Sequence, residues 1–215
     1  MTALAKARAV RTKDPDGQFG QSNSACFDHG IYGCAATCLQ FLRRLYIGKD
    51  ISLDEVSRRS GRPCGVNRGM VVSEIKTFIR WSRLPYVYRA GLTAGQVWNA
   101  AKVGPVLVPH IYGQTPEWKG YRYGRVVADG KPNGYARPFG KAGKNQLIGF
   151  EDGRHLAALL GAESSTAVYW FDPNHDSASR PQRVAYDIIA SSQLRRLIES
   201  WPLAQRWAFV PTRSP

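Results

Sequence analysis

Cys34 is the residue of this sequence whose surroundings best suit nucleophilic chemistry. It follows Gly33 and opens the segment CAATCLQFLRRLYIG, whose apolar residues recur at spacings of three and four, as in an amphipathic helix. A thiol at a helix N-terminus lies beside free backbone N–H groups and the positive end of the helix dipole, which favour the thiolate. We therefore predict that Cys34 is a nucleophile whose own N–H donates to an oxyanion. Cys38, one turn later on the apolar face, is predicted to pack in the core.

His155 and Asp172 stand at the outer ends of two apolar runs, HLAALL and AVYWFD. Alone, each has a common structural explanation, as a strand-end histidine or as an aspartate that starts a turn. If the runs form a hairpin around GAESST, an even count pairs Leu160 with Ala167 and, further out, His155 with Asp172. A carboxylate beside an imidazole orients a general base. The spacing therefore predicts a Cys-His-Asp triad.

Other residues are weaker candidates for the same roles. Cys26 and His29 form a rival nucleophile and base in a Gly-flanked loop, but no helix end or strand holds them. His110 and His175 have no special context. A serine nucleophile is not supported, since no G-x-S-x-G occurs.

The four cysteines are expected to be reduced thiols. The chain is larger than a disulfide-rich mini-protein and its first residues carry no apolar signal region. Cys34 and Cys38 have C-x3-C spacing, but no second Cys or His pair follows at finger-like distance, so zinc is disfavoured. No cofactor is predicted.

Hydrophobic periodicity and capping residues indicate the elements that position these groups. A helix from Cys34 should end near Gly48, and Ser52 and Thr93 should cap two further helices. Helices are expected at 34–47, 52–60, 70–82, 93–102 and 192–200, and strands at 104–109, 155–160, 167–172 and 207–210. Helices first and antiparallel strands later predict an α+β fold.

The domain organisation is predicted to be one domain with two additions. Residues 1–24 are polar and read as an extended N-terminal arm, which leaves 25–215 as the folded domain. Segment 119–144 holds seven Lys or Arg, one Asp and six Gly, and we expect a basic flap or insertion.

The formal charge of +14 predicts attraction to polyanions, and the cations and aromatic residues of 119–144 suit single-stranded nucleic acid. No run of about 18 apolar residues occurs, so no transmembrane segment is expected. We expect the protein to be cytoplasmic or exported without a classical signal peptide.

Three motifs together resemble papain-like cysteine peptidases. GCAATCL at Cys34, GRHLAA at His155 and YWFDPN at Asp172 resemble the YopT/AvrPphB type of effector protease, while Leu92–Val108 is similar to the group that includes bacteriocin-leader peptidases. The resemblance implies a papain-like fold, a Cys34-His155-Asp172 triad, a protein substrate and a role as effector or toxin.

The sequence departs from that family pattern at the oxyanion hole. A Gln or Asn about six residues before the nucleophile is usual, and here that place holds Asp28. Gln21 and Asn23 are possible substitutes. Two other functions stay open: acyl transfer by the same triad, as in a transglutaminase or deamidase, and a basic nucleic-acid-binding or virion-associated protein with a peptidase-like fold.

Overall fold

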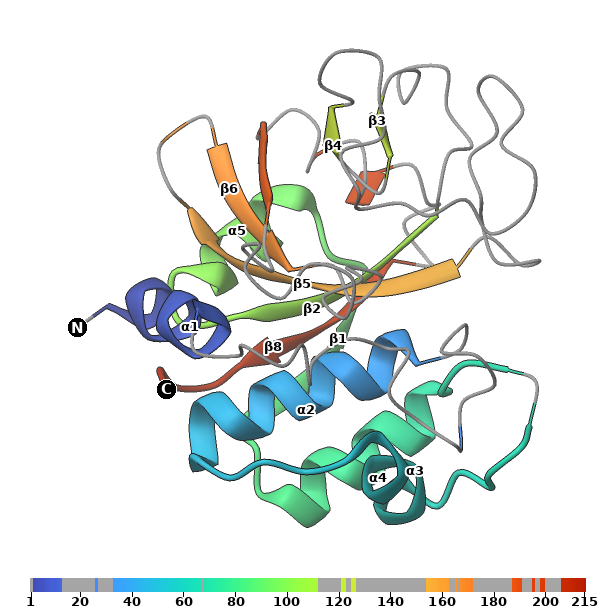
Figure 1. Cartoon of the computed structure of the whole chain (residues 1–215). Helices are drawn as coiled ribbons and strands as arrows, with labels where there is room; N and C mark the ends of the chain where they lie inside the picture. Colours follow the sequence, from blue (N-terminus) through green and yellow to red (C-terminus); the bar gives the residue numbers. More distant parts are fainter. Residues whose placement is uncertain are drawn as a thin grey trace.

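The computed structural model of the chain describes residues 2–12, 26, 33–66, 68–111, 121–122, 125–126, 154–162, 165, 167–171, 187–190, 195, 198–199 and 206–215. A layer of helices lies against one face of an antiparallel sheet, and one helix lies on the opposite face (Figure 1). The fold is therefore α+β, as the sequence predicted.

Three helices form the layer below the sheet: α2 (Cys34–Ile47), α3 (Leu53–Ser60) and α4 (Val72–Ser82). Their ends follow local signals. The Ser52 hydroxyl accepts a hydrogen bond from the Glu55 N–H at 3.1 Å, which begins α3. Gly48 and Gly61 end α2 and α3 in left-handed backbone conformation. The three predicted helices are confirmed.

The helix on the opposite face, α5, spans Ala94–Ala101 and is also confirmed. A capping box begins it. The Gln96 N–H donates to the Thr93 hydroxyl at 3.3 Å, and the Thr93 N–H donates to the Gln96 side-chain oxygen at 2.8 Å.

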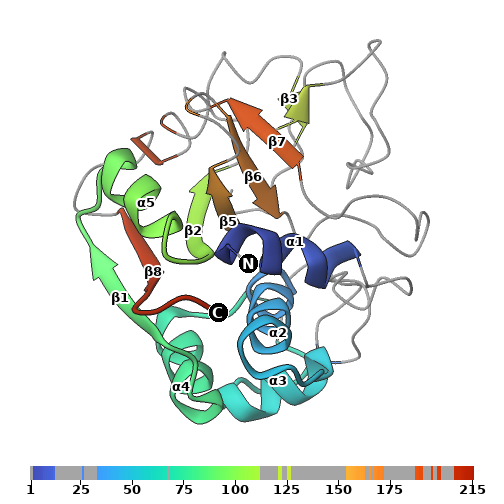
Figure 2. The ribbon, with the colours of Figure 1, turned by 90° about the vertical axis from the view of Figure 1, so that its left-hand side faces the viewer.

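The N-terminal residues differ from the prediction. Ala3–Thr12 form helix α1 rather than an extended arm. The cause is an alanine-rich sequence of high helix propensity with apolar residues at Leu4, Ala7 and Val10, which pack against the core. Figure 2 shows α1 beside the sheet and near α2.

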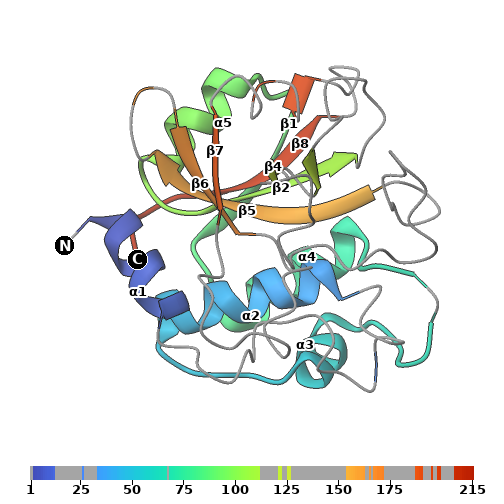
Figure 3. The same cartoon turned by 45° about the horizontal axis from the view of Figure 1, so that its top comes forward.

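The main sheet has the strand order β1-β8-β2-β5-β6-β7 (Figure 3). Its strands are β1 (Tyr86–Ala90), β8 (Trp207–Pro211), β2 (Val106–Ile111), β5 (Arg154–Ala162), β6 (Ala167–Phe171) and β7 (Asp187–Ala190). Strands β1 and β7 were not predicted. Two short paired strands, β3 (Tyr121–Arg122) and β4 (Arg125–Val126), begin the basic flap. The rest of 119–144, and most of the predicted helix at 192–200, lie outside the described residues.

The hairpin of β5 and β6 is antiparallel as predicted, but its predicted register is wrong. Ala158 pairs with Phe171, where the even count expected Tyr169. The register shifts between Leu159 and Gly161, which marks a β-bulge in β5. The even count misplaced the turn, because Ala162 already pairs with Val168 where Ser165 was expected, so the offset is three residues beside the turn and two beyond the bulge. Gly161, with φ of +147°, adopts a backbone conformation that permits the bulge.

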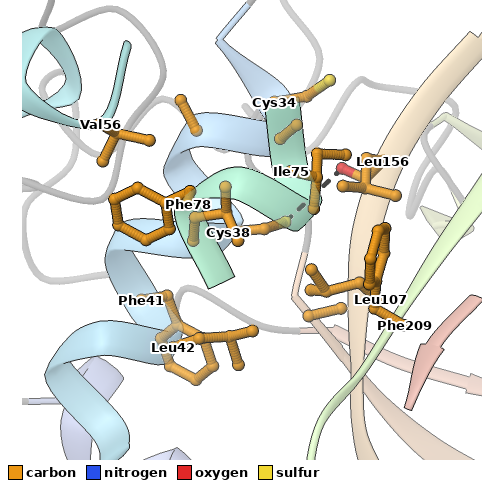
Figure 4. Packing of buried hydrophobic residues seen from close by; sticks show 14 of the residues in the cluster. Cys34, Cys38, Phe41, Leu42, Val56, Ile75, Phe78, Leu107, Leu156 and Phe209 are labelled. Atoms are coloured by element: carbon orange, nitrogen blue, oxygen red, sulfur yellow. Dashed lines mark hydrogen bonds between the residues drawn. The ribbon is translucent and has the colours of Figure 1, made fainter. Parts of the chain in front are cut away.

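Alternation along β5 divides the core into two clusters. Leu156, Ala158 and Leu160 belong to the cluster that faces α2, whereas Ala157 and Leu159 belong to the cluster that faces α5. The α2 cluster includes Phe41 and Phe171, whose ring centroids are 4.9 Å apart, and Figure 4 shows its packing between helices and sheet.

No helix within the described part of the chain is long and apolar enough to cross a membrane.

Candidate active site

Cys34 is the first residue of α2, as the sequence predicted, and its thiol is free. Gly33 precedes it and has no side chain to cap the N–H groups of the first turn. Those groups are the donors that stabilise negative charge at a helix N-terminus. Cys34 is 9% exposed, and its sulfur points away from the packed side chains below it (Figure 4).

Cys38 has the core role that was predicted for it. It is fully buried, and its thiol donates a hydrogen bond to the Leu156 carbonyl oxygen, with a sulfur–oxygen distance of 3.7 Å. This contact attaches the second turn of α2 to β5. Because Cys34 precedes Cys38 by one turn, it lies toward the end of the sheet where β5 begins (Figure 1).

His155 is the second residue of β5, and its backbone pairs with His110 of β2. Asp172 and the side chain of His155 lie outside the described residues, so the triad stays a prediction. Sequence analysis gave His110 no role, yet the ladder sets two histidines opposite each other near the end of the sheet where β5 begins. Aligning the apolar runs VLVP and LAAL as antiparallel neighbours would have revealed this pair.

The described side chains of β5 alternate from Leu156 onward: Leu156 packs toward α2, and Ala157 packs toward α5. The side chains of Arg154 and His155, which precede them, lie outside the described residues.

Two of the four cysteines are not reduced thiols, contrary to expectation. Cys26 and Cys64 form a disulfide across 38 residues of sequence. Helix α3 and the turn after it bring the two Cα atoms to 4.3 Å, a proximity that cysteine spacing alone does not reveal. Cys26 is therefore not a free nucleophile that rivals Cys34.

Several candidates named from the sequence lie outside the described residues, namely Gln21, Asn23, Asp28, His29 and His175. Among the side chains that the structure describes, no group of three or more His, Cys, Asp or Glu is arranged to hold a metal ion.

A charged pair lies beside the disulfide-bonded loop. The Arg68 guanidinium donates to both carboxylate oxygens of Glu74, at 3.0 and 2.7 Å, and the Val71 N–H donates to Glu74 at 2.9 Å. Burial raises the pKa of Glu74, but these hydrogen bonds and the positive charges of Arg68 and Arg62 outweigh it, so the pKa lies below its usual value. Burial lowers the pKa of the Arg62 guanidinium.

Comparison with known proteins identifies related folds. No protein-family model matches the sequence, and no curated protein matches it. A structure described as a C39-like peptidase from Bacillus anthracis is similar, with a TM-score of 0.51 and 12% identity over 86% of this chain and 90% of that one. The peptidase domain of Streptococcus ComA, a bifunctional ABC transporter involved in quorum sensing, has a TM-score of 0.45 and 12% identity over 84% of this chain and 93% of that one. The first similarity shows that this chain has the papain-like α+β fold of a C39-like peptidase.

Proposed function

We propose that the protein is a cysteine peptidase with Cys34 as nucleophile, His155 as general base and Asp172 as the acid that orients it. The observation that carries this proposal is the free thiol of Cys34 at the first residue of α2. The fold shared with a protein described as a C39-like peptidase supports it.

The proposed reaction is acyl transfer to water. The Cys34 thiolate attacks the peptide carbonyl, and the N–H of Cys34 donates to the resulting oxyanion. The imidazolium of His155 protonates the amine that leaves, which yields an acyl-enzyme. Water, deprotonated by His155, then releases the acid and restores the thiol.

The observed register removes the direct opposition of His155 and Asp172 that the even count predicted, because Ala158 pairs with Phe171. The hydrogen bond from the imidazole to the carboxylate is part of the proposal and rests on the resemblance of the GRHLAA and YWFDPN motifs to papain-like peptidases.

The rate of Cys34 alkylation tests the nucleophile and the base together. Iodoacetamide reacts with the thiolate, and a histidine that accepts the thiol proton promotes its formation. We expect His155→Ala to slow Cys34 alkylation at pH 6 at least tenfold, as followed by peptide mass spectrometry. His110→Ala is the matched control, since His110 pairs with His155 across the same ladder, and it should leave the rate within twofold.

Hydrolysis of fluorescently labelled casein tests the activity itself. We expect Cys34→Ala to abolish hydrolysis and Cys38→Ala to retain it. If His110→Ala slowed alkylation and His155→Ala did not, the base would be His110. If Cys34→Ala hydrolysed casein at the wild-type rate, the proposal would be rejected.

Acyl transfer to an amine is the rival reaction, because the same three residues would perform it. Product mass separates the two, since hydrolysis adds water at a cleaved bond, whereas cross-linking or deamidation changes glutamine side chains. The resemblance of the FDPN motif to YopT/AvrPphB-type proteases supports a role as effector or toxin on a host or competitor protein. New protein N-termini in a cell lysate treated with wild type but not with Cys34→Ala would identify such a substrate.

A further inference from the structure

Cys26 lies eight residues before Cys34, and three separate interactions fix it. Its sulfur is bonded to Cys64, its N–H donates to the Asp54 carboxylate at 3.0 Å, and its carbonyl oxygen accepts from the Arg62 guanidinium at 3.1 Å. Asp54 belongs to α3, and Arg62 and Cys64 belong to the loop that follows α3. Cys26 is therefore attached to the helical layer both by a covalent bond and by hydrogen bonds.

The buried side chain of Arg62 holds the main chain of this loop through hydrogen bonds. Its side chain is 2% exposed, and its guanidinium donates to several main-chain carbonyl oxygens. The acceptors are those of Cys26 at 3.1 Å, Pro63 at 3.2 Å, Val66 at 2.7 Å and Arg68 at 2.7 Å. A planar guanidinium presents donors in fixed directions, so it holds these carbonyls in one arrangement, which a lysine ammonium cannot reproduce.

The chain between the fixed Cys26 and α2 is short. Seven residues separate Cys26 from Cys34, and a connection of that length restricts where its far end can lie. Gly33 is the last of them, and its carbonyl accepts the Thr37 N–H at 2.9 Å, the bond that closes the first turn of α2. Anchoring Cys26 therefore limits how the chain enters that turn.

We propose that the Cys26–Cys64 disulfide and Arg62 act as one clamp that positions the N-terminus of α2. It follows, resting on the peptidase function proposed above, that the enzyme works only when this disulfide is oxidised and Cys34 is reduced. The clamp residues are positioning residues, because they act on Cys34 through the chain that enters α2.

The disulfide offers a reductant one accessible sulfur. Cys64 is exposed, whereas Cys26 is 6% exposed. A dithiol reductant would attack the Cys64 sulfur, and Cys26 would leave as a thiolate that takes up a proton. The second thiol of the reductant would then release Cys64, so the protein disulfide is reduced to two thiols while the dithiol is oxidised to a disulfide. A dithiol added at high concentration to keep Cys34 reduced would therefore also reduce the Cys26–Cys64 disulfide and so open the clamp.

Hydrogen exchange measured by mass spectrometry tests the clamp without any substrate. The forms compared are oxidised wild type, wild type reduced with dithiothreitol, and the double variant Cys26→Ala with Cys64→Ala. We expect amides of residues 36–41 in α2 to exchange at least tenfold faster in the two clamp-free forms, while amides of α5 stay within twofold. Unchanged exchange in α2 would overturn the clamp.

Casein hydrolysis tests the consequence for catalysis. Loss of the clamp should lower kcat at least tenfold and leave KM within twofold, and dithiothreitol should slow the wild type but not the double variant. Arg62→Lys should lower kcat as well, whereas Arg58→Lys, on an exposed residue of α3, should not. Should the double variant fail to fold, reduced wild type and Arg62→Lys decide the matter.

The outcomes separate this inference from the proposed function. Faster exchange in α2 with no hydrolysis by any form would support the clamp and reject the peptidase. Hydrolysis with an unchanged kcat after reduction would reject the redox requirement and keep the peptidase.

Discussion

The Cys38 sulfur lies 3.7 Å from the carbonyl oxygen of Leu156, and this contact fixes α2 along the direction of β5. Cys34 precedes Cys38 by one turn, and His155 precedes Leu156 by one residue. The contact therefore fixes the position of the first turn of α2 relative to the first residues of β5. A helix shifted by one turn would change that position by about 5.4 Å.

Replacement of the two free cysteines should give opposite results. Cys38→Ala removes a fully buried sulfur and should lower the free energy of unfolding by about 1–2 kcal/mol in urea titration, with casein hydrolysis retained. Cys34→Ala should change stability by less than about 1 kcal/mol and abolish hydrolysis. A larger stability loss for Cys34→Ala than for Cys38→Ala would contradict this division of roles.

Gly161→Ala should destabilise the bulge of β5. Gly161 has φ of +147°, where side chains are rarely tolerated, and an added Cβ would lie 3.4 Å from Leu4 of α1. We expect a loss of about 1–3 kcal/mol in thermal or urea unfolding. Gly95→Ala in α5 is the control, because the added Cβ would make only an ordinary contact with the Thr93 hydroxyl oxygen at 3.9 Å and alanine favours helix, so it should gain about 0.5–1 kcal/mol. Equal effects would mean that the bulge carries no strain.

Glu74→Gln should destabilise the protein in a pH-dependent way. The folded-state pKa of Glu74 lies below its ordinary value of 4.5, so its stabilisation is fully present above that value and disappears as pH falls through the folded-state pKa. We expect a loss of about 1–3 kcal/mol at pH 7, measured by urea unfolding. The difference from wild type should shrink below about pH 4.5. Glu199→Gln, which breaks an exposed ion pair with Arg195, should show little change at any pH. A difference for Glu74→Gln that stayed constant from pH 7 to pH 3 would contradict the assignment.

Polyanion binding should depend on the basic flap. Changing Lys131, Arg137, Lys141 and Lys144 to Ser should weaken binding to single-stranded DNA. The slope of log K against log salt concentration should become less steep by about 3, because each of the four lost phosphate contacts accounts for about 0.7 of that slope. The matched control changes four exposed cations of the described part, Lys49, Arg80, Arg83 and Arg89, to Ser. Fluorescence anisotropy at several salt concentrations gives both slopes. A larger effect of the control set would place the binding surface at these four control residues instead of the basic flap.

Local signals predicted those parts of the fold that local chemistry determines. Ser52, Gly48 and Thr93 set the ends of helices because capping uses only neighbouring residues. Helix α1 was missed because the polar composition of residues 1–24 concealed the small apolar stripe at Leu4, Ala7 and Val10.

Long-range pairing was less accessible from the sequence. The register of β5 and β6 is set where Ala162 pairs with Val168 beside the turn, and a symmetric count around GAESST places that turn too early in the sequence. The bond between Cys26 and Cys64 arises from tertiary folding, and no pattern within either segment encodes it. For the proposed site, the position of Cys34 at a helix start was correct because it depends on one helix alone.

The place of β8 in the sheet has a consequence for biosynthesis. β8 lies between β1 and β2, yet Trp207 follows Ala90 by more than a hundred residues. On the ribosome, β1 is complete long before its partner β8 emerges, and Phe209 then takes its position opposite Leu107. Until β8 is synthesised, the edges of β1 and β2 that will pair with it are unpaired, and these apolar strands are available to chaperones or to aggregation. Because β1 and β2 pair with a strand that is distant in sequence, folding is expected to be slow and to finish only after β8 has been translated.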